Sequence, residues 1–153
     1  MGILRAVMLL ALIVWIGGII FFSFVVAPTL FTILPTTTMA GGVVSVALSR
    51  LHVMGMIAGI VFLICSFIYN WLRYAQLRLF NPVHIFMVLM IILTAISQFV
   101  VTPRIRSMRA DPSSVTAQDD FARLHRDSVR LEGGTLLCGL AVIILTSRRF
   151  GNS

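Results

Sequence analysis

The chain has 153 residues, of which 59% are hydrophobic and only 11% charged, and its formal net charge is +7. A soluble domain usually carries about 25% charged residues, so this composition excludes a soluble globular enzyme and predicts an integral membrane protein. All twelve basic residues are arginines and none forms part of a separate basic domain. We therefore expect the positive charge to set topology and to contact lipid, with no role in binding nucleic acid.

The first predicted helix covers about residues 6–27, which is long and apolar enough to span a bilayer. Gly17-Gly18 would allow a neighbouring helix to approach closely. We expect Pro28 to end this helix, because a proline disfavours the helical conformation in the residue before it. The same proline disfavours cleavage after Val25-Val26-Ala27, so the segment is interpreted as a retained helix rather than a signal peptide.

Three further helices are predicted at about 41–74, 82–102 and 116–148, all within one membrane domain that covers residues 1–153. Thr36 to Thr38 offer a cap for the second helix, and Asn81-Pro82 begins the third, since proline is tolerated in a first turn. The connector after Pro103 is expected to be solvated. The fourth helix has only fifteen uncharged residues, 133–147, and so should begin outside the bilayer among charged residues.

Two stretches of the chain resemble each other. Phe-Val-Val-Ala-Pro at 24–28 is followed, 24 residues after its proline, by an Arg-Leu-His ending at His52. Phe-Val-Val-Thr-Pro at 99–103 is followed, 22 residues after its proline, by an Arg-Leu-His ending at His125. The repeat predicts an all-α, four-helix transmembrane bundle built from two tandem helical pairs by internal duplication. Duplicated membrane proteins commonly place a site where the halves meet.

The paired histidines are the main candidates for a site. His52 and His125 are expected at the same depth near one membrane face, looking at each other across the bundle interior. Two such imidazoles could ligate the iron of a b-type haem, or less readily copper. Gly55 and Gly59 lie on the same helical face as His52 and would leave a groove for a flat macrocycle or for a close helix. The cations placed to pair with haem propionates are Arg50, Arg123 and Arg126.

Other readings of these residues remain open. Each histidine and arginine could simply cap an interfacial helix end and bond to headgroups or backbone. Cys65 and Cys138, thirteen residues beyond the two histidines, are expected to lie deeper, to face away from the site and to pack without forming a disulfide. His84 has no counterpart in the repeat and is expected to be satisfied by backbone or water.

Glu132 lies seven residues after His125, on the same helical face and about two turns deeper. An acid at that depth is costly and is a functional-site hypothesis by default. It could carry a proton, bind a cation or pair with an arginine, of which Arg130 is the nearest in sequence. We expect it to tune the histidine site or to move protons.

Several segments carry a family resemblance: Trp15 to Gly18, Val25 to Phe31, Pro103 to Ile105 and Phe121 to Ser128. Together they resemble the bacterial domain-of-unknown-function family related to animal transmembrane protein 205. The resemblance implies a four-helix membrane protein, and the animal relative's link to platinum-drug resistance implies metal or small-molecule handling. That family often has an asparagine where this chain has Leu131-Glu132, so no role for Glu132 carries over.

A weaker resemblance is to copper-resistance-D-type and membrane protoporphyrinogen-oxidase-type domains. Those domains often have a Leu-His ahead of the Trp-x-Gly-Gly turn of their first helix. Here the turn is present at Trp15 to Gly18, but Val7-Met8 stands in place of the Leu-His.

Three functions follow as hypotheses. The first is a redox or metal-handling protein that holds haem between His52 and His125; the second is a small-molecule or metal-ion transport or resistance protein; the third is a structural subunit of a membrane complex. A homodimer or a larger assembly is compatible with each. We expect a multi-pass protein of the bacterial inner membrane with cytoplasmic termini, because one side carries arginines and no acid: Arg5, Arg73, Arg78, Arg148 and Arg149.

Overall fold

The computed structural model describes residues 2–74, 81–110 and 117–151, and within them almost every residue is helical. Four helices in this part of the chain are long and apolar enough to cross a membrane: Gly2–Ile33, Thr37–Arg73, Pro82–Ser107 and Arg123–Arg148. Since the described residues contain no strand, the predicted all-α four-helix bundle is confirmed, and the chain is a polytopic membrane protein.

The first spanning helix is continuous but not uniform. It consists of α1 (Gly2–Leu12), the π-helical turn η1 (Ile13–Gly17), α2 (Gly18–Phe21), a second π-helical turn η2 (Phe22–Val26) and α3 (Ala27–Ile33). The second is a single helix, α4 (Thr37–Tyr74). The third consists of α5 (Pro82–Ile96), the π-helical turn η3 (Ser97–Val101) and α6 (Thr102–Ala110), and the fourth is α7 (Ala117–Gly151).

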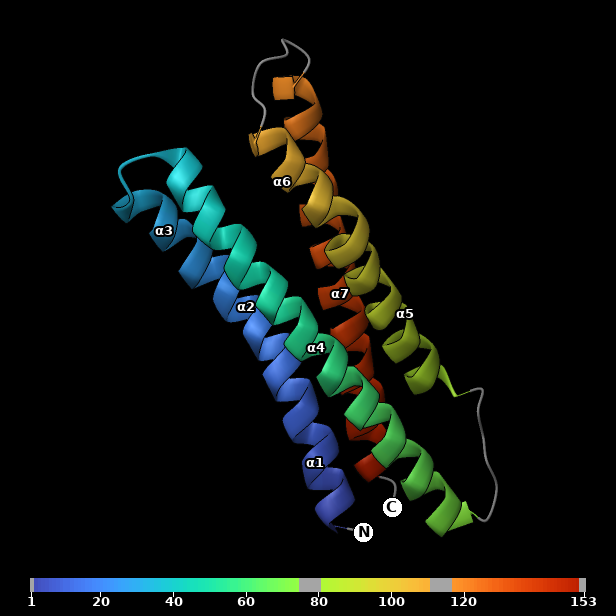
Figure 1. Cartoon of the computed structure of the whole chain (residues 1–153). Coiled ribbons are helices and arrows are strands. Elements are labelled where there is room, and N and C mark those ends of the chain that lie inside the picture. The colour runs from blue at the N-terminus through green and yellow to red at the C-terminus, as the bar shows by residue number, and fades with distance from the viewer. Residues whose placement is uncertain (1, 75–80, 111–116, 152–153) are drawn as a thin grey trace.

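The helices are arranged as two antiparallel pairs. α1 packs along α4, α5 packs along α7, and α4 also contacts α5, so that the pairs join side by side (Figure 1). Both chain ends lie at one end of the bundle, and the turn between α3 and α4 lies at the other (Figure 1). Below, the end that holds this turn is called the loop end, and the opposite end the terminal end.

Two predicted helix starts are confirmed in detail. The Thr36 hydroxyl accepts a hydrogen bond from the backbone N–H of Met39 at 3.2 Å, ahead of α4. The Asn81 side chain accepts one from the N–H of Val83 at 3.2 Å, and Pro82 is the first residue of α5. Both side chains satisfy a backbone donor that a helix start leaves open. Thr116, the predicted first residue of the fourth helix, lies outside the described residues.

The expectation that Pro28 ends the first helix is wrong. The helix passes through Pro28 and continues to Ile33, and the third helix likewise passes through Pro103 to Ala110, where a solvated connector was expected. A proline within a helix lacks an N–H and crowds the carbonyl of the preceding turn. Here the preceding turn widens to a π-helix: the N–H of Ala27 donates to the Phe22 carbonyl, and that of Thr102 donates to the Ser97 carbonyl.

These two π-helical turns have the same position relative to their prolines. η2 begins six residues before Pro28 and ends two before it, and η3 has the same offsets from Pro103. The turns therefore fall on the two similar sequence stretches. Equal offsets are what two related halves would give, although the duplication itself stays a prediction.

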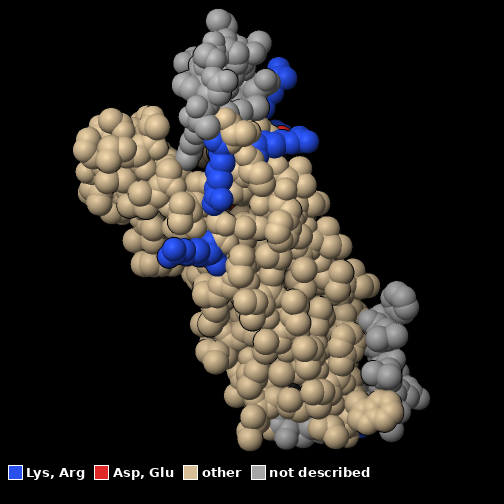
Figure 2. All heavy atoms as spheres, viewed as in Figure 1, with Lys and Arg blue, Asp and Glu red and all other residues tan. Residues whose placement is uncertain are grey.

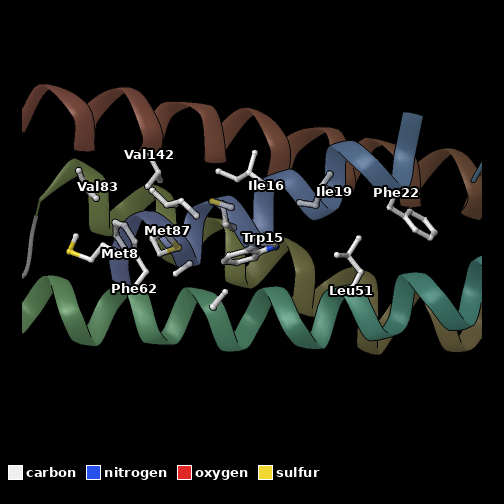
Figure 3. Close-up of a cluster of buried hydrophobic side chains, with 14 residues drawn as sticks. Met8, Trp15, Ile16, Ile19, Phe22, Leu51, Phe62, Val83, Met87 and Val142 are labelled. Carbon is white, nitrogen blue, oxygen red and sulfur yellow. The ribbon is translucent and has the colours of Figure 1, made fainter. Parts of the chain in front are cut away.

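The core is centred on Trp15, whose side chain is 1% exposed and lies between the first helix and α4 near Met8 and Phe62 (Figure 3). Gly55 and Gly59 leave the space on α4 that the indole ring occupies, since a Cβ atom at either position would overlap the ring. The groove expected at these glycines thus exists, but the side chain of a close neighbouring helix fills it. It is not open to a macrocycle.

The close packing of Trp15 against α4 can be tested by adding one methyl group at Gly55. We expect Gly55→Ala to lower the free energy of unfolding by about 1–3 kcal/mol, because three indole atoms would have to move in a closely packed core. Gly42→Ala, on the same helix with open space around it, is the matched control and should cost nothing. Thermal unfolding of both variants in detergent measures the difference; equal stabilities would contradict the packing.

Candidate functional site

A chain of polar side chains crosses the apolar bundle toward its loop end. Nε2 of His52 lies 3.0 Å from Oε2 of Glu132, and Nδ1 of His52 lies 3.2 Å from Oε1 of Gln98. The Gln98 amide nitrogen in turn donates to the Ser49 hydroxyl at 2.7 Å. Since these four side chains come from α4, η3 and α7, three of the four spanning helices meet at His52.

The local structure explains how these groups meet. Ser49 and His52 are three residues apart on α4 and so share one face. Gln98 lies in the π-helical turn η3, which exists because of Pro103, and such turns are frequent at functional sites. The His52 side chain is 2% exposed and that of Glu132 is 14% exposed. The contact between imidazole and carboxylate is therefore made inside the bundle, where water competes little.

The second carboxylate oxygen of Glu132 is the unusual atom of the site. Oε1 is buried and has no hydrogen-bond partner among the residues that the structure describes. A buried carboxylate oxygen without a donor costs free energy, which makes it an acceptor for any group that can enter.

Such a group would have room, because Glu132 lies on the wall of a cavity of about 760 Å³. The cavity is enclosed by the first spanning helix beyond Ile19, by the first turns of α4, by α6 and by one face of α7. The residues that α7 contributes recur every three or four positions, as one helix face requires. They are His125, Ser128, Val129, Glu132, Gly133 and Leu136.

Most of the wall is apolar. The first helix contributes Phe22, Phe24, Pro28 and Phe31 among others, and α4 contributes Val44 and Leu48. A mainly apolar cavity with a few convergent polar groups is the usual form of a small-molecule site.

The structure brings only part of the predicted histidine pair together. His125 lines the cavity, but its side chain is exposed, and it lies seven residues, or about 10 Å along α7, from the Glu132 that contacts His52. Both ring nitrogens of His52 are engaged, one by Gln98 and one by Glu132. Ligation of iron or copper by His52 would require breaking one of these contacts, so the bis-histidine haem site stays a prediction that the fold does not favour.

The described residues contain no group of three or more His, Cys, Asp or Glu side chains arranged to hold a metal ion. Cys65 and Cys138 are free thiols, each half-buried.

The arginines predicted at the site, Arg50, Arg123 and Arg126, have exposed side chains and do not line the cavity. On the face shown in Figure 2, the arginines drawn in blue gather toward the loop end. Arg106 reaches the cavity rim, where it donates to the hydroxyl of Ser45 at 3.4 Å. The suggestion that Glu132 pairs with Arg130 is wrong: Arg130 approaches Asp127 at 3.7 Å on the exposed side of α7, and Glu132 faces inward to His52.

Sequence reasoning missed the roles of Gln98 and Ser49. A signal existed, because an amide in an otherwise apolar span needs a partner, and antiparallel pairing of α4 with α5 and η3 makes that partner predictable. His52 pairs with Gln98, and Ser66 pairs with His84 at 2.8 Å. Each step is fourteen residues, in opposite directions, as an antiparallel register requires. His84 is thus buried with the Ser66 hydroxyl as one of its partners, a side chain that the sequence did not suggest.

Comparison with known proteins adds a family and little chemistry. Residues 10–113, more than half of the chain, match the family described as a domain of unknown function (DUF4149). This supports the predicted domain-of-unknown-function family and leaves its relation to animal transmembrane protein 205 as a prediction. No curated protein and no solved structure matches the chain. The matched range contains His52 and Gln98 but ends before His125 and Glu132.

The coupling between His52 and Glu132 can be measured by a double-mutant cycle. We expect His52→Leu to cost about 3 kcal/mol of stability, because it leaves the inward-facing carboxylate of Glu132 without its partner. Replacing both residues by leucine should cost less than the sum of the two single changes, by about 1–3 kcal/mol.

The control is Arg126→Leu, which changes a charged residue at an exposed position of α7 and should alter stability by no more than about 0.5 kcal/mol. Chemical unfolding in detergent micelles gives all four values. Strict additivity of the two leucine variants would contradict the contact.

Proposed function

The chain belongs to DUF4149, a family of domains of unknown function, so we infer its activity from the site. We propose that it binds a small amphipathic cation in the cavity beside Glu132, here called the loop-end cavity, as part of a transport or resistance function. One observation carries the proposal. Glu132 holds one carboxylate oxygen against His52 and leaves the other buried and unpartnered, and the residue itself lines a 760 Å³ cavity.

The chemistry of the wall defines the class of ligand. Aromatic and aliphatic side chains favour a ligand with apolar surface, since burying such surface contributes about 25 cal/mol per Å². The open acceptor on Glu132 favours an N–H donor or a positive charge, which gains a charge-assisted hydrogen bond. An amphipathic organic cation meets both requirements. A bare metal ion would find few ligands, since Glu132 and His125 are the only acid and histidine among the cavity residues described.

The position of the cavity favours movement of the ligand over simple storage. It lies where the two helical pairs meet, toward the loop end. Toward the terminal end the core cluster around Trp15, Phe62 and Met87 fills the interior (Figure 3). The site is thus accessible from one half of the bundle and closed toward the other, which is the arrangement of one state in an alternating-access cycle.

We further propose that the protein resides in a bacterial inner membrane with its termini in the cytoplasm, supported by the arginines without acids at the terminal end. The cavity, at the opposite end, would then face away from the cytoplasm. This orientation fits a protein that releases or captures its ligand on the outer side of that membrane.

Binding of ethidium, an amphipathic cation whose fluorescence rises in apolar surroundings, tests the proposal. We expect purified protein in lipid nanodiscs to bind ethidium, and Glu132→Gln to weaken binding about 10- to 100-fold, because it removes a charge-assisted contact. The matched control is Asp127→Asn, which removes one acid from the exposed side of the same helix and should leave affinity unchanged.

Two outcomes would contradict the proposal. One is absence of ethidium binding, or binding equally strong in Glu132→Gln. The other is a Soret absorption band that disappears in both His52→Leu and His125→Leu, because that would establish the bis-histidine haem site in place of an ion pair between His52 and Glu132.

A further inference from the structure

We infer that a cation entering the loop-end cavity exchanges with a single proton that Glu132 and His52 share. The inference rests on the proposed function, since it concerns the same ligand, but it adds a second and separable event. The geometry of Gln98 carries it.

Gln98 fixes the position of one proton on the His52 ring. Its amide N–H donates to the Ser49 hydroxyl, which turns the amide oxygen toward Nδ1 of His52. An amide oxygen can only accept, so Nδ1 must carry a hydrogen. The other ring nitrogen, Nε2, is then the one that faces Glu132.

A second proton is needed between Nε2 and the carboxylate. With Nδ1 already protonated, a neutral ring offers only a lone pair at Nε2, and the facing Oε2 of Glu132 is an acceptor 3.0 Å away. Two acceptors at that distance repel. One shared proton removes the repulsion, whether it resides on the carboxyl group or on the imidazole, and in both cases the pair has no net charge. The low-dielectric interior favours this neutral arrangement.

A cation at Oε1 of Glu132 would favour loss of the proton that Glu132 and His52 share. It stabilises the ionised carboxylate by direct attraction, so that the carboxylate can turn toward the cation and away from Nε2 of His52 when the shared proton leaves. The exchange balances in charge: a neutral protonated pair and one cation give a deprotonated pair that holds the cation, plus one proton released to water. The cavity provides the exit, because Glu132 lines it.

Few other ionisable side chains near Glu132 and His52 could release or accept this proton. The first spanning helix has no ionisable residue between Gly18 and Ile33. α4 contributes Ser49, and its Arg50 is exposed on the surface; η3 contributes Gln98. α6 contributes Arg106, which contacts Ser45, and on α7 the remaining titratable cavity residue is His125.

Toward the terminal end, the buried polar side chains described nearest to the pair are single hydroxyls such as those of Thr94 and Thr135. The next pair of buried polar side chains on these helices, Ser66 and His84, lies fourteen residues away, which is about 21 Å. Trp15, Phe62 and Met87 fill the core between the two pairs. Proton and cation therefore exchange through the same opening, as a protein that couples the two movements requires.

Calorimetric titration of the nanodisc protein with ethidium, in two buffers that differ in ionisation enthalpy, counts protons released per cation bound. We expect about one proton released for each cation bound, and an apparent affinity that rises with pH because proton release and cation binding are linked. Both effects should vanish in Glu132→Gln. They should persist in Asp127→Asn, which alters the exposed acid of the same helix. The number of protons released per cation bound should also persist in His125→Gln, which alters the other titratable cavity residue.

The wild-type proton count can contradict the exchange even if a variant fails to fold. Ethidium binding without proton release at any pH at which the protein is folded would overturn the exchange and leave the proposed binding function intact. Proton release that persists in Glu132→Gln, or that is lost in His125→Gln alone, would also overturn it. Absence of ethidium binding would remove both.

Discussion

The contact between His52 and Glu132 is the interaction on which the arrangement of this bundle depends. In a bilayer the apolar surfaces of helices gain little by meeting, because lipid tails are equally apolar. An acid in the interior of a spanning helix must find a partner or remain protonated. Glu132 finds that partner on α4, so the contact that satisfies it also ties the second helical pair to the first, at the edge of the cavity that the pairs enclose.

The prolines and glycines make this contact possible. Pro28 and Pro103 widen the preceding turns without ending their helices, and the second of these turns carries Gln98 to the His52 ring. Gly55 and Gly59 admit Trp15 to the face of α4, which closes the interior below the polar chain. The bundle is therefore closely packed around Trp15 toward its terminal end and hollow toward its loop end. This asymmetry is what a site accessible from one side requires.

The sequence was a good guide to the fold and a partial guide to the site. Hydrophobic length and the Asn81 cap predicted the helices because those signals are local. The end at Pro28 was predicted wrongly, because a neighbouring α4 and a π-helical turn can hold a proline within a helix. The repeat drew attention to His52 and His125, but helix rotation and depth decide which groups meet, and those depend on packing. Glu132, seven residues beyond the second histidine of the repeat, proved to be the partner of His52, whereas His125 remained on an exposed face of the cavity.

A direct measurement of the distance between the His52 ring and the Glu132 carboxyl group in lipid bilayers would test the central claim. Solid-state NMR of protein labelled with ¹⁵N in histidine and ¹³C in glutamate suits it, because the chain has three histidines and Glu132 is its only glutamate. We predict a strong dipolar coupling between Nε2 of His52 and the Glu132 carboxyl carbon, with Nδ1 of His52 protonated. A coupling to His125 instead, or none to any histidine, would contradict the site.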